Sequence, residues 1–351
     1  MIRTRPTLNQ VAELAGVSIA SVSRALNGRS ASANTVERVR AAAAELGYVP
    51  DATARSLKLG HALQIAFAVD DVGNPVYVEM MRAIEEVVRK SGYRLVVSST
   101  GSRPSEAIDL VNSLSRGYAD GMIISPLRIT DDLIVALQTA TVPVVVIGSL
   151  PQDIDIDTVQ TDSAHGVVLA YQHLREMGHE RIAFINGPAD TTPGRARARG
   201  YGEAARAAGL SDPSILTMPA TDFTVAAGLD AGRELLTHHR AADGSLTIDA
   251  LIAANDLLAL GAIHAAVESG LDVPGDLAIV GVDDIEIASV YNPTLTSVSL
   301  QSAARGRHAG ELLLQRIASP GMSARRVLVP PELIVRASSK SPTPPSGRVT
   351  P

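Results

Sequence analysis

The chain has 351 residues, 46% of them hydrophobic, and a formal net charge of −6. This length allows two or three domains, and this composition allows a substantial core, so we expect a globular protein. The absence of cysteine excludes disulfides, thiolate metal sites and cysteine nucleophiles. Neither a signal peptide nor a run of about 18 apolar residues is visible, so we expect a cytoplasmic protein with no membrane partner.

The first expected elements are two short helices joined by a tight turn, within TLNQVAELAGVSIASVSRALN from Thr7 to Asn27. Apolar residues recur at helical spacing, and Gly16 permits the sharp turn. Ser18 is placed to cap a second helix over 19–26. This is the pattern of a helix-turn-helix, in which the second helix can enter a DNA major groove. The alternative is a small helical subdomain that contacts nothing.

Small and hydroxylated residues on the second helix favour DNA contact, because they allow close approach and can form hydrogen bonds to bases and phosphates. These residues are Ala20, Ser21, Ser23 and the basic Arg24. A third helix is expected to open at Ser32 or Thr35 and to end at Gly47. A further short helix follows, capped by Asp51. Its length makes it marginal in water without a packing partner.

Charge is distributed unevenly along the chain. Residues 1–61 contain eight Lys and Arg against four Asp and Glu, a net charge of +4, which leaves −10 for the rest of the chain. A basic head attached to an acidic body is typical of a phosphate-contacting module joined to a binding domain.

From residue 64 onward, apolar runs alternate with amphipathic helices, which predicts parallel sheets with helices on both faces. We expect strands at 65–69, 94–98, 121–124, 142–147, 181–185, 250–253 and 277–280. We expect helices at 76–91, 104–117, 129–139, 163–177, 194–209, 225–241, 256–270 and 302–317. A break near Thr161 would give two lobes, with a ligand cleft along the carboxyl ends of the strands.

Over nearly its whole length the chain resembles the LacI/GalR (lactose-repressor/galactose-repressor) family of bacterial transcriptional regulators. The matching blocks are VAELAGVSIASVSRALNG, ELGYVPDATARSL, GNPVYVEMMRAIEE, DGMIISP, INGPADTTPGRARARGY, AANDLLALGAI and IVGVDDIEIASVYNPTLTSV. The resemblance implies a repressor that binds a palindromic DNA operator as a homodimer under the control of a small-molecule effector, with no cofactor and no metal. Its fold would be a helix-turn-helix head plus an α/β, two-lobed domain like the periplasmic binding proteins.

The resemblance also implies domain boundaries. A DNA-binding domain would span residues 1–50, a hinge helix 51–61, and a two-lobed effector-binding and dimerisation domain 62–338. Within the last, the N-lobe would comprise 62–161 and 293–322, and the C-lobe 162–292 and 323–338. The Pro- and Ser-rich tail, 339–351, is expected to be disordered. No C-terminal heptad helix is present, which favours a dimer over a tetramer.

For DNA contact, the resemblance makes Ile19 and Ala20 specificity positions and Arg24 a base-contacting residue. Leu57 would wedge into the central minor groove beside Ala54, which suits an apolar side chain on a marginal helix. The alternative makes Leu57 an ordinary linker residue. The complete expected set is Thr7, Ser18, Ile19, Ala20, Ser21, Ser23, Arg24, Asn27, Ala54 and Leu57.

For the effector, the resemblance implies that Tyr77 and Phe223 stack on a ring or sugar face. Arg197 and Asp283 would bind polar groups, and Asn255 would lie at the carboxyl end of its strand. Ordinary structural roles compete with these: an aromatic residue at helical spacing can be core, and an asparagine before a helix can be only an N-cap.

The chain departs from the family pattern at three places. It has Val76 before Tyr77 where a pair of aromatics is frequent, Ser149 where an arginine commonly follows the fourth strand, and Leu300 in place of a frequent glutamine. A sugar or sugar derivative is favoured as effector because Asp, Asn and Arg suit hydroxyl groups, but a nucleoside would also use stacking and arginine.

Two other functional classes are weaker. An enzyme could use the loose glycine pattern at Gly200, but that pattern follows an Arg-rich helix and not a strand, and no catalytic set or metal-ligand spacing is visible. A periplasmic-type small-molecule binding protein would account for two lobes but has no use for residues 1–60. The DNA-reading head therefore decides against it.

Overall fold

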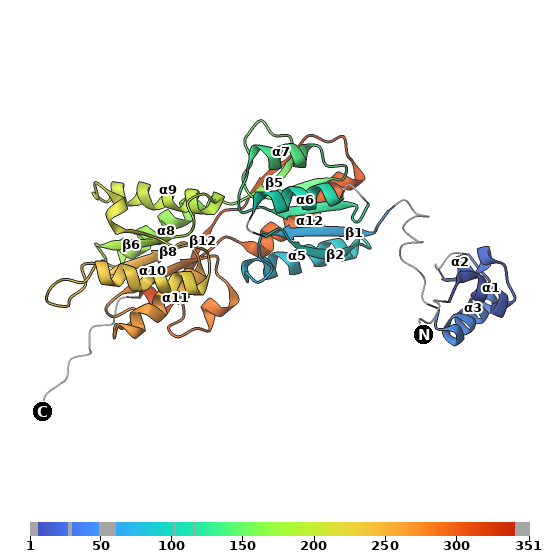
Figure 1. Cartoon of the computed structure of the whole chain (residues 1–351), viewed down its shortest axis with the longest axis horizontal. Helices are drawn as coiled ribbons and strands as arrows, with labels where there is room; N and C mark the ends of the chain where they lie inside the picture. The colour runs from blue at the N-terminus through green and yellow to red at the C-terminus, as the bar shows by residue number, and fades with distance from the viewer. Residues whose placement is uncertain (1–5, 27–29, 49–60, 102, 115–116, 341–351) are drawn as a thin grey trace, which may run out of the picture. The chain divides into compact units, whose positions relative to one another are not determined.

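A computed structural model describes the chain except for residues 1–5, 27–29, 49–60, 102, 115–116 and 341–351 (Figure 1). The chain divides into two compact units, 1–62 and 63–351. No helix in the described ranges is long and apolar enough to cross a membrane.

The first unit contains three helices, as expected: α1 (Leu8–Ala15), α2 (Ile19–Leu26) and α3 (Ala33–Leu46). Each helix contributes a fully buried valine, so the three close around one small core. Gly16 ends α1 and Gly47 ends α3, both in the left-handed conformation. Arg38 of α3 stabilises the turn between α1 and α2, because its guanidinium group donates a hydrogen bond to the carbonyl oxygen of Gly16 at 3.1 Å.

In the second unit, one lobe, the N-lobe, is built on a parallel sheet with the strand order β11-β5-β4-β3-β1-β2. Its strands are β1 (Gln64–Val69), β2 (Arg94–Ser99), β3 (Gly121–Ser125), β4 (Val144–Ile147), β5 (Asp157–Gln160) and β11 (Arg326–Leu328). Helices α5 (Val76–Lys90) and α12 (Ser302–Ala318) cover one face, and α6 (Pro104–Leu114) and α7 (Asp131–Gln138) cover the other (Figure 1).

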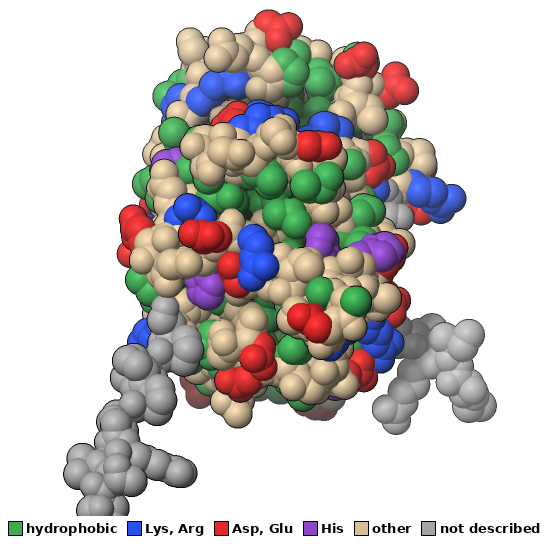
Figure 2. Space-filling view, turned by 90° about the vertical axis from the view of Figure 1, so that its left-hand side faces the viewer, with side chains coloured by type: hydrophobic (Ala, Val, Ile, Leu, Met, Phe, Trp, Pro, Cys, Tyr) green, Lys and Arg blue, Asp and Glu red, His purple; other side chains and the backbone are tan. Residues whose placement is uncertain are grey.

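The other lobe, the C-lobe, has the strand order β12-β10-β9-β8-β6-β7, and only β12 is antiparallel to its neighbour. Its strands are β6 (Ile182–Asn186), β7 (Thr217–Pro219), β8 (Ala250–Ala253), β9 (Ala278–Val282), β10 (Thr296–Ser299) and β12 (Glu332–Ile334). Its helices are α8 (Ser163–Glu176), α9 (Thr192–Ala207), α10 (Val225–His238), α11 (Asp256–Glu268) and the short η1 (Pro213–Leu216), η2 (Glu286–Ser289) and η3 (Ala337–Ser339). On the face of this unit seen in Figure 2, acidic and basic side chains are interspersed and do not form a single-sign patch.

The chain crosses between the lobes three times: after β5, after β10 and after β11. The sequence placed the second crossing before residue 293 and the third before 323, and both positions are wrong. Strand β10 pairs with β9 of the C-lobe, and β11 pairs with β5 of the N-lobe. Strands of three or four residues carry too little periodicity to reveal the sheet to which they belong.

The disordered tail was expected to begin at Ser339, but this residue is part of the folded C-lobe. Ser339 is fully buried, and its hydroxyl is 2.8 Å from Nε2 of His173 and 2.7 Å from the hydroxyl of Thr296. The preceding Ser338 donates to the carbonyl oxygen of Ile279. These contacts attach residues 337–339 to the C-lobe, so the polar composition of this segment was misleading.

Asp157 of β5 links α12 and the segment before β11 to the N-lobe sheet. Its buried carboxylate accepts from Arg316 of α12 at 2.9 Å and from Arg325, just before β11, at 3.2 Å. Burial alone would raise the pKa of Asp157, but the hydrogen bonds from these two arginines outweigh burial and hold the pKa below 3.8.

We predict that Asp157→Asn lowers the free energy of unfolding by about 3 kcal/mol at neutral pH, the lower end for a broken buried ion pair. A depressed carboxyl pKa stabilises the fold fully above the ordinary value of 3.8, and that stabilisation is lost as pH falls through the folded-state pKa. The stability difference between the two proteins, measured by urea unfolding, should therefore shrink in acid. A difference independent of pH would contradict this account.

Close helix packing in the C-lobe depends on Gly200 of α9. A Cβ atom there would lie 2.2 Å from the carbonyl oxygen of Ala164 in α8. Gly202, on the same helix, faces only the movable guanidinium of Arg206 at 3.2 Å.

We predict that Gly200→Ala destabilises the protein by about 1–3 kcal/mol, because the two helices must separate. Gly202→Ala is the matched control and should be neutral or slightly stabilising, since alanine favours the helix. Urea unfolding measures both variants. Equal stability of the two would show that the contact between α8 and α9 is not tight.

Candidate functional site

Two regions concentrate the expected site residues: the exposed face of α2 and a cavity between the lobes of the second unit. On α2, Val22 and Ala25 are buried, so Ile19, Ala20 and Arg24 lie on the exposed side. The side chain of Ile19 is 49% exposed. This arrangement leaves an apolar residue and a cation available to a partner.

A chain of hydroxyl groups runs along the same helix. Ser18 caps it by accepting from the backbone N–H of Ser21 at 3.2 Å, and the two hydroxyls are 2.9 Å apart. Arg24 donates to the Ser21 hydroxyl at 3.4 Å. Thr7 caps α1 in the same way, and Ser23 is half-buried. The expected contacts Asn27, Ala54 and Leu57 lie outside the described residues.

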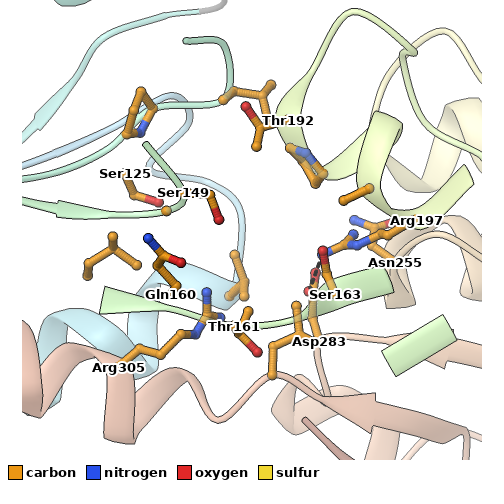
Figure 3. A pocket seen from close by; sticks show the side chains of 18 of the residues that line it. Ser125, Ser149, Gln160, Thr161, Ser163, Thr192, Arg197, Asn255, Asp283 and Arg305 are labelled. Carbon is orange, nitrogen blue, oxygen red and sulfur yellow. Dashed lines mark hydrogen bonds and ion pairs between the residues drawn. The ribbon is translucent and has the colours of Figure 1, made fainter. Parts of the chain in front are cut away.

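The cavity has a volume of about 360 Å³. Its walls come from the segments that follow the carboxyl ends of strands in both sheets, as the strand-helix alternation predicted (Figure 3). Its lining also includes residues at each of the three crossings: Thr161, Leu300 and Leu328. All five expected effector residues line it: Tyr77, Arg197, Phe223, Asn255 and Asp283.

On the C-lobe side, Arg197 of α9 and Asp283 after β9 form an ion pair of 3.1 Å, and both are almost fully buried. Burial raises the pKa of Asp283, while the charges of Arg197 and Arg305 oppose that rise. The Phe223 ring lies 6.0 Å from the Arg197 guanidinium, within reach of a cation–π contact. A Cβ on Gly187 would lie 2.1 Å from the Phe223 ring, so this glycine makes room for the aromatic wall.

On the N-lobe side, Tyr77 of α5 donates its hydroxyl to Asp70, the residue after β1. Burial, followed by the charge of Asp70, raises the pKa of Tyr77 well above its ordinary value. Burial also raises the pKa of Asp70. The tyrosine ring packs edge-on against Phe67 at 6.4 Å, so Tyr77 belongs both to the core and to the cavity wall.

Asn255 also has two roles. Its side-chain oxygen accepts from the N–H of Leu258 and caps α11, as the structural alternative had it. Its side-chain nitrogen donates to the carbonyl oxygen of Phe223 at 3.2 Å. These bonds hold the residue rigidly in the cavity wall.

Several polar residues of the cavity were not predicted from the sequence. The sequence predicted a helix over 302–317 without singling out Arg305, and it predicted a break between the lobes near Thr161 without assigning ligand contacts there. All three departures from the family pattern, Val76, Ser149 and Leu300, also line the cavity. The further unpredicted polar residues of the lining are Asp70, Asn74, Ser125, Gln160, Thr161, Asp162, Ser163, Thr192, Arg199 and Arg305.

Four of the buried polar atoms that lack a hydrogen-bond partner belong to this cavity: Thr161 Oγ1, Thr192 Oγ1, Arg197 Nε and Arg305 Nε. Buried polar groups ordinarily have partners, so this concentration marks a place built for a polar ligand. Across the described residues, no cluster of three or more His, Cys, Asp or Glu side chains could hold a metal ion.

Comparison with known proteins gives matches in both units. Residues 7–51 match the model of bacterial regulatory proteins of the lacI family, and residues 171–339 match a periplasmic binding protein-like domain. The chain is 36% identical over 335 residues to the ribose operon repressor of Escherichia coli, which covers 95% of this chain and 99% of that protein.

Solved structures of similar extent also match. The lac repressor dimer bound to operator and the anti-inducer ONPF has a TM-score of 0.82 and 29% identity, and covers 96% of this chain and 100% of that chain. The complex of the transcriptional regulator CelR with cellobiose has a TM-score of 0.71 and 34% identity, and covers 95% and 100%.

Proposed function

The chain belongs to the LacI family of bacterial regulatory proteins, and we propose that it is a repressor whose dimer binds a palindromic operator under the control of a small molecule bound between the lobes. One observation carries this proposal: a cavity with buried, unpartnered polar atoms occurs in the same chain as a helix-turn-helix with an exposed second helix. The match of residues 7–51 decides against a periplasmic-type binding protein.

Ile19, Ala20 and Arg24 are the proposed base-reading residues of α2. Thr7 and the α2 serines, as short hydroxylated residues near a helix start, suit contacts to the DNA backbone. For Asn27, Ala54 and Leu57 the proposal rests on the family resemblance alone. In this proposal, Leu57 inserts into the minor groove beside Ala54, and residues 51–58 fold when the protein binds the operator.

The proposed effector is a sugar or sugar derivative. Arg197, Asp283 and Asn255 offer charged and amide groups that suit hydroxyls, and Phe223 and Tyr77 offer aromatic walls. Names of similar proteins support this class, since one is a ribose operon repressor and another was solved with cellobiose. The relatives are named as regulators, and we propose that this cavity likewise binds its ligand without catalysing a reaction. We also propose that the protein acts in the cytoplasm, where the operator lies.

Dimerisation is part of the same proposal, because a palindromic operator requires two heads related by a twofold axis. Exposed apolar side chains on β2, the edge strand of its sheet, support it: Val96 is 41% exposed and Val97 37%. Partly exposed valines on an edge strand favour a surface that is covered in the assembly. Sedimentation of the purified chain tests the dimer directly.

We predict that Arg24→Ala weakens binding to the specific operator by about 1–3 kcal/mol, because a base contact is lost. Arg40→Ala is the matched control, since it removes the same charge from the exposed part of α3. Titration of both variants with operator and with random DNA should show that only Arg24→Ala reduces the preference for the operator. Equal preference in the two variants would remove Arg24 from the reading face.

We predict that Arg197→Ala and Asp283→Ala abolish effector binding, because each removes a polar group of the cavity lining and leaves the other member of the buried ion pair without its counter-charge. Both variants should still bind operator, and no metabolite should alter that binding. Arg233→Ala, which breaks a surface ion pair with Glu268 far from the cavity lining, should respond like the wild type. A cavity variant that responds normally in operator titrations would show that the ligand binds elsewhere.

A further inference from the structure

Arg305 is a buried guanidinium group at the edge of the proposed effector site. It belongs to the first turn of α12, is 8% exposed, and reaches toward the cavity near Gln160 and Thr161 (Figure 3). Within the described residues its side chain makes one hydrogen bond, from Nη2 to the hydroxyl of Ser302 at 3.2 Å, and its Nε has no partner. The side chain therefore directs unused donors into the cavity wall.

No carboxylate among the described residues lies within ion-pair distance of Arg305. The acid that acts on it is Asp283, which already pairs with Arg197 at 3.1 Å. Burial lowers the pKa of Arg305 to about 10, while Asp283 opposes the change, so the group stays charged at neutral pH. Two guanidinium groups thus share one carboxylate, and this cluster carries a charge of +1.

A stabilising role in the helix does not account for this cation. Positive charge in the first turn of a helix is unfavourable, because the helix dipole is positive at that end. An unpaired buried charge is also costly to the fold. An uncompensated cation at the edge of a ligand cavity suits a ligand that brings the missing negative charge.

We propose that the effector is a polyhydroxylated carboxylate, such as a sugar acid, whose carboxylate group is bound by Arg305. This inference rests on the proposed function and narrows the effector class. The planar guanidinium fork matches a carboxylate, and a single negative charge neutralises the cluster. The unpartnered hydroxyl of Thr161 is a second donor in the same wall. The hydroxyl groups of the ligand face Arg197, Asp283 and Asn255.

The first experiment uses matched ligands on the full chain. D-glucuronate, D-galacturonate and D-gluconate are compared by calorimetry with D-glucose and D-galactose, and with phosphate esters of glucose and ribose. At least one of these carboxylates should bind about a hundredfold more tightly than its neutral counterpart, the scale expected for a buried charge pair. Preference for the neutral sugars or the phosphate esters, or no binding by any carboxylate, overturns the proposal.

The second experiment replaces the cation. Arg305→Met keeps an unbranched side chain in the helix and should abolish the preference for the carboxylate, while Arg305→Lys should retain part of it. Without ligand, Arg305→Met should raise the melting temperature by about 2–4 °C, because an unbalanced buried charge is gone. Arg307→Met is the control on the exposed side of the same helix and should change neither property.

Two results would overturn the assignment of Arg305. A lower melting temperature of ligand-free Arg305→Met would make Arg305 a structural partner of Asp283, and unchanged carboxylate affinity would remove it from the site. The proposed function is tested separately, by titrating wild-type protein with DNA selected from a random pool. A neutral sugar that alters DNA binding would overturn the proposed carboxylate effector but not the proposed function as a regulator. Failure to select any DNA sequence would count against the proposed operator binding.

Discussion

The three crossings between the lobes are the constraint on which the rest of the second unit depends. Because the chain passes from sheet to sheet three times, each lobe is assembled from segments that are discontinuous in the sequence. The crossings also form part of the cavity through Thr161, Leu300 and Leu328. A ligand there contacts both lobes and the segments about which they can rotate, so its binding energy depends on the lobe arrangement.

The cavity concentrates features that cost stability. Asp283 has a backbone φ of 109°, a conformation unfavourable for any residue but glycine, and its carboxylate is buried. Arg197 and Arg305 are buried in the same wall. The sheets offset this cost, because their central strands are apolar runs buried on both faces. Strained and charged groups therefore persist beside sheets with a well-buried apolar core, which is the arrangement expected of a binding site.

Much of this fold could be predicted from the sequence, because long helices and central strands carry a clear hydrophobic period. The expected helix over 256–270, for example, corresponds to α11. Strands of three or four residues carry none, so the segments of β10 and β11 were assigned to the wrong lobes. Periodicity likewise could not identify Arg305 as a cavity residue, since a charge on an amphipathic helix normally faces water. The expected effector residues were named from the family resemblance, and Arg305 was not among them.

Helix α12 connects the cavity with the crossings through direct contacts. It begins just after the second crossing and carries Arg305 in its first turn. Arg316, three turns later, binds Asp157 at the start of β5, the strand that leads into the first crossing. Arg325 binds the same carboxylate just before β11, the strand that leads into the third.

A change of charge balance at Arg305 therefore acts on α12. Through Asp157, this helix is linked to β5 and β11, the strands that lead into the first and third crossings. The packed contacts of α12 with the N-lobe sheet keep that helix from relaxing independently of the lobe. Any shift of α12 relative to Asp283 must then appear as a movement of the N-lobe against the C-lobe. Ligand binding at this point is thus coupled to the geometry of the whole second unit, and the coupling is reciprocal by thermodynamic necessity.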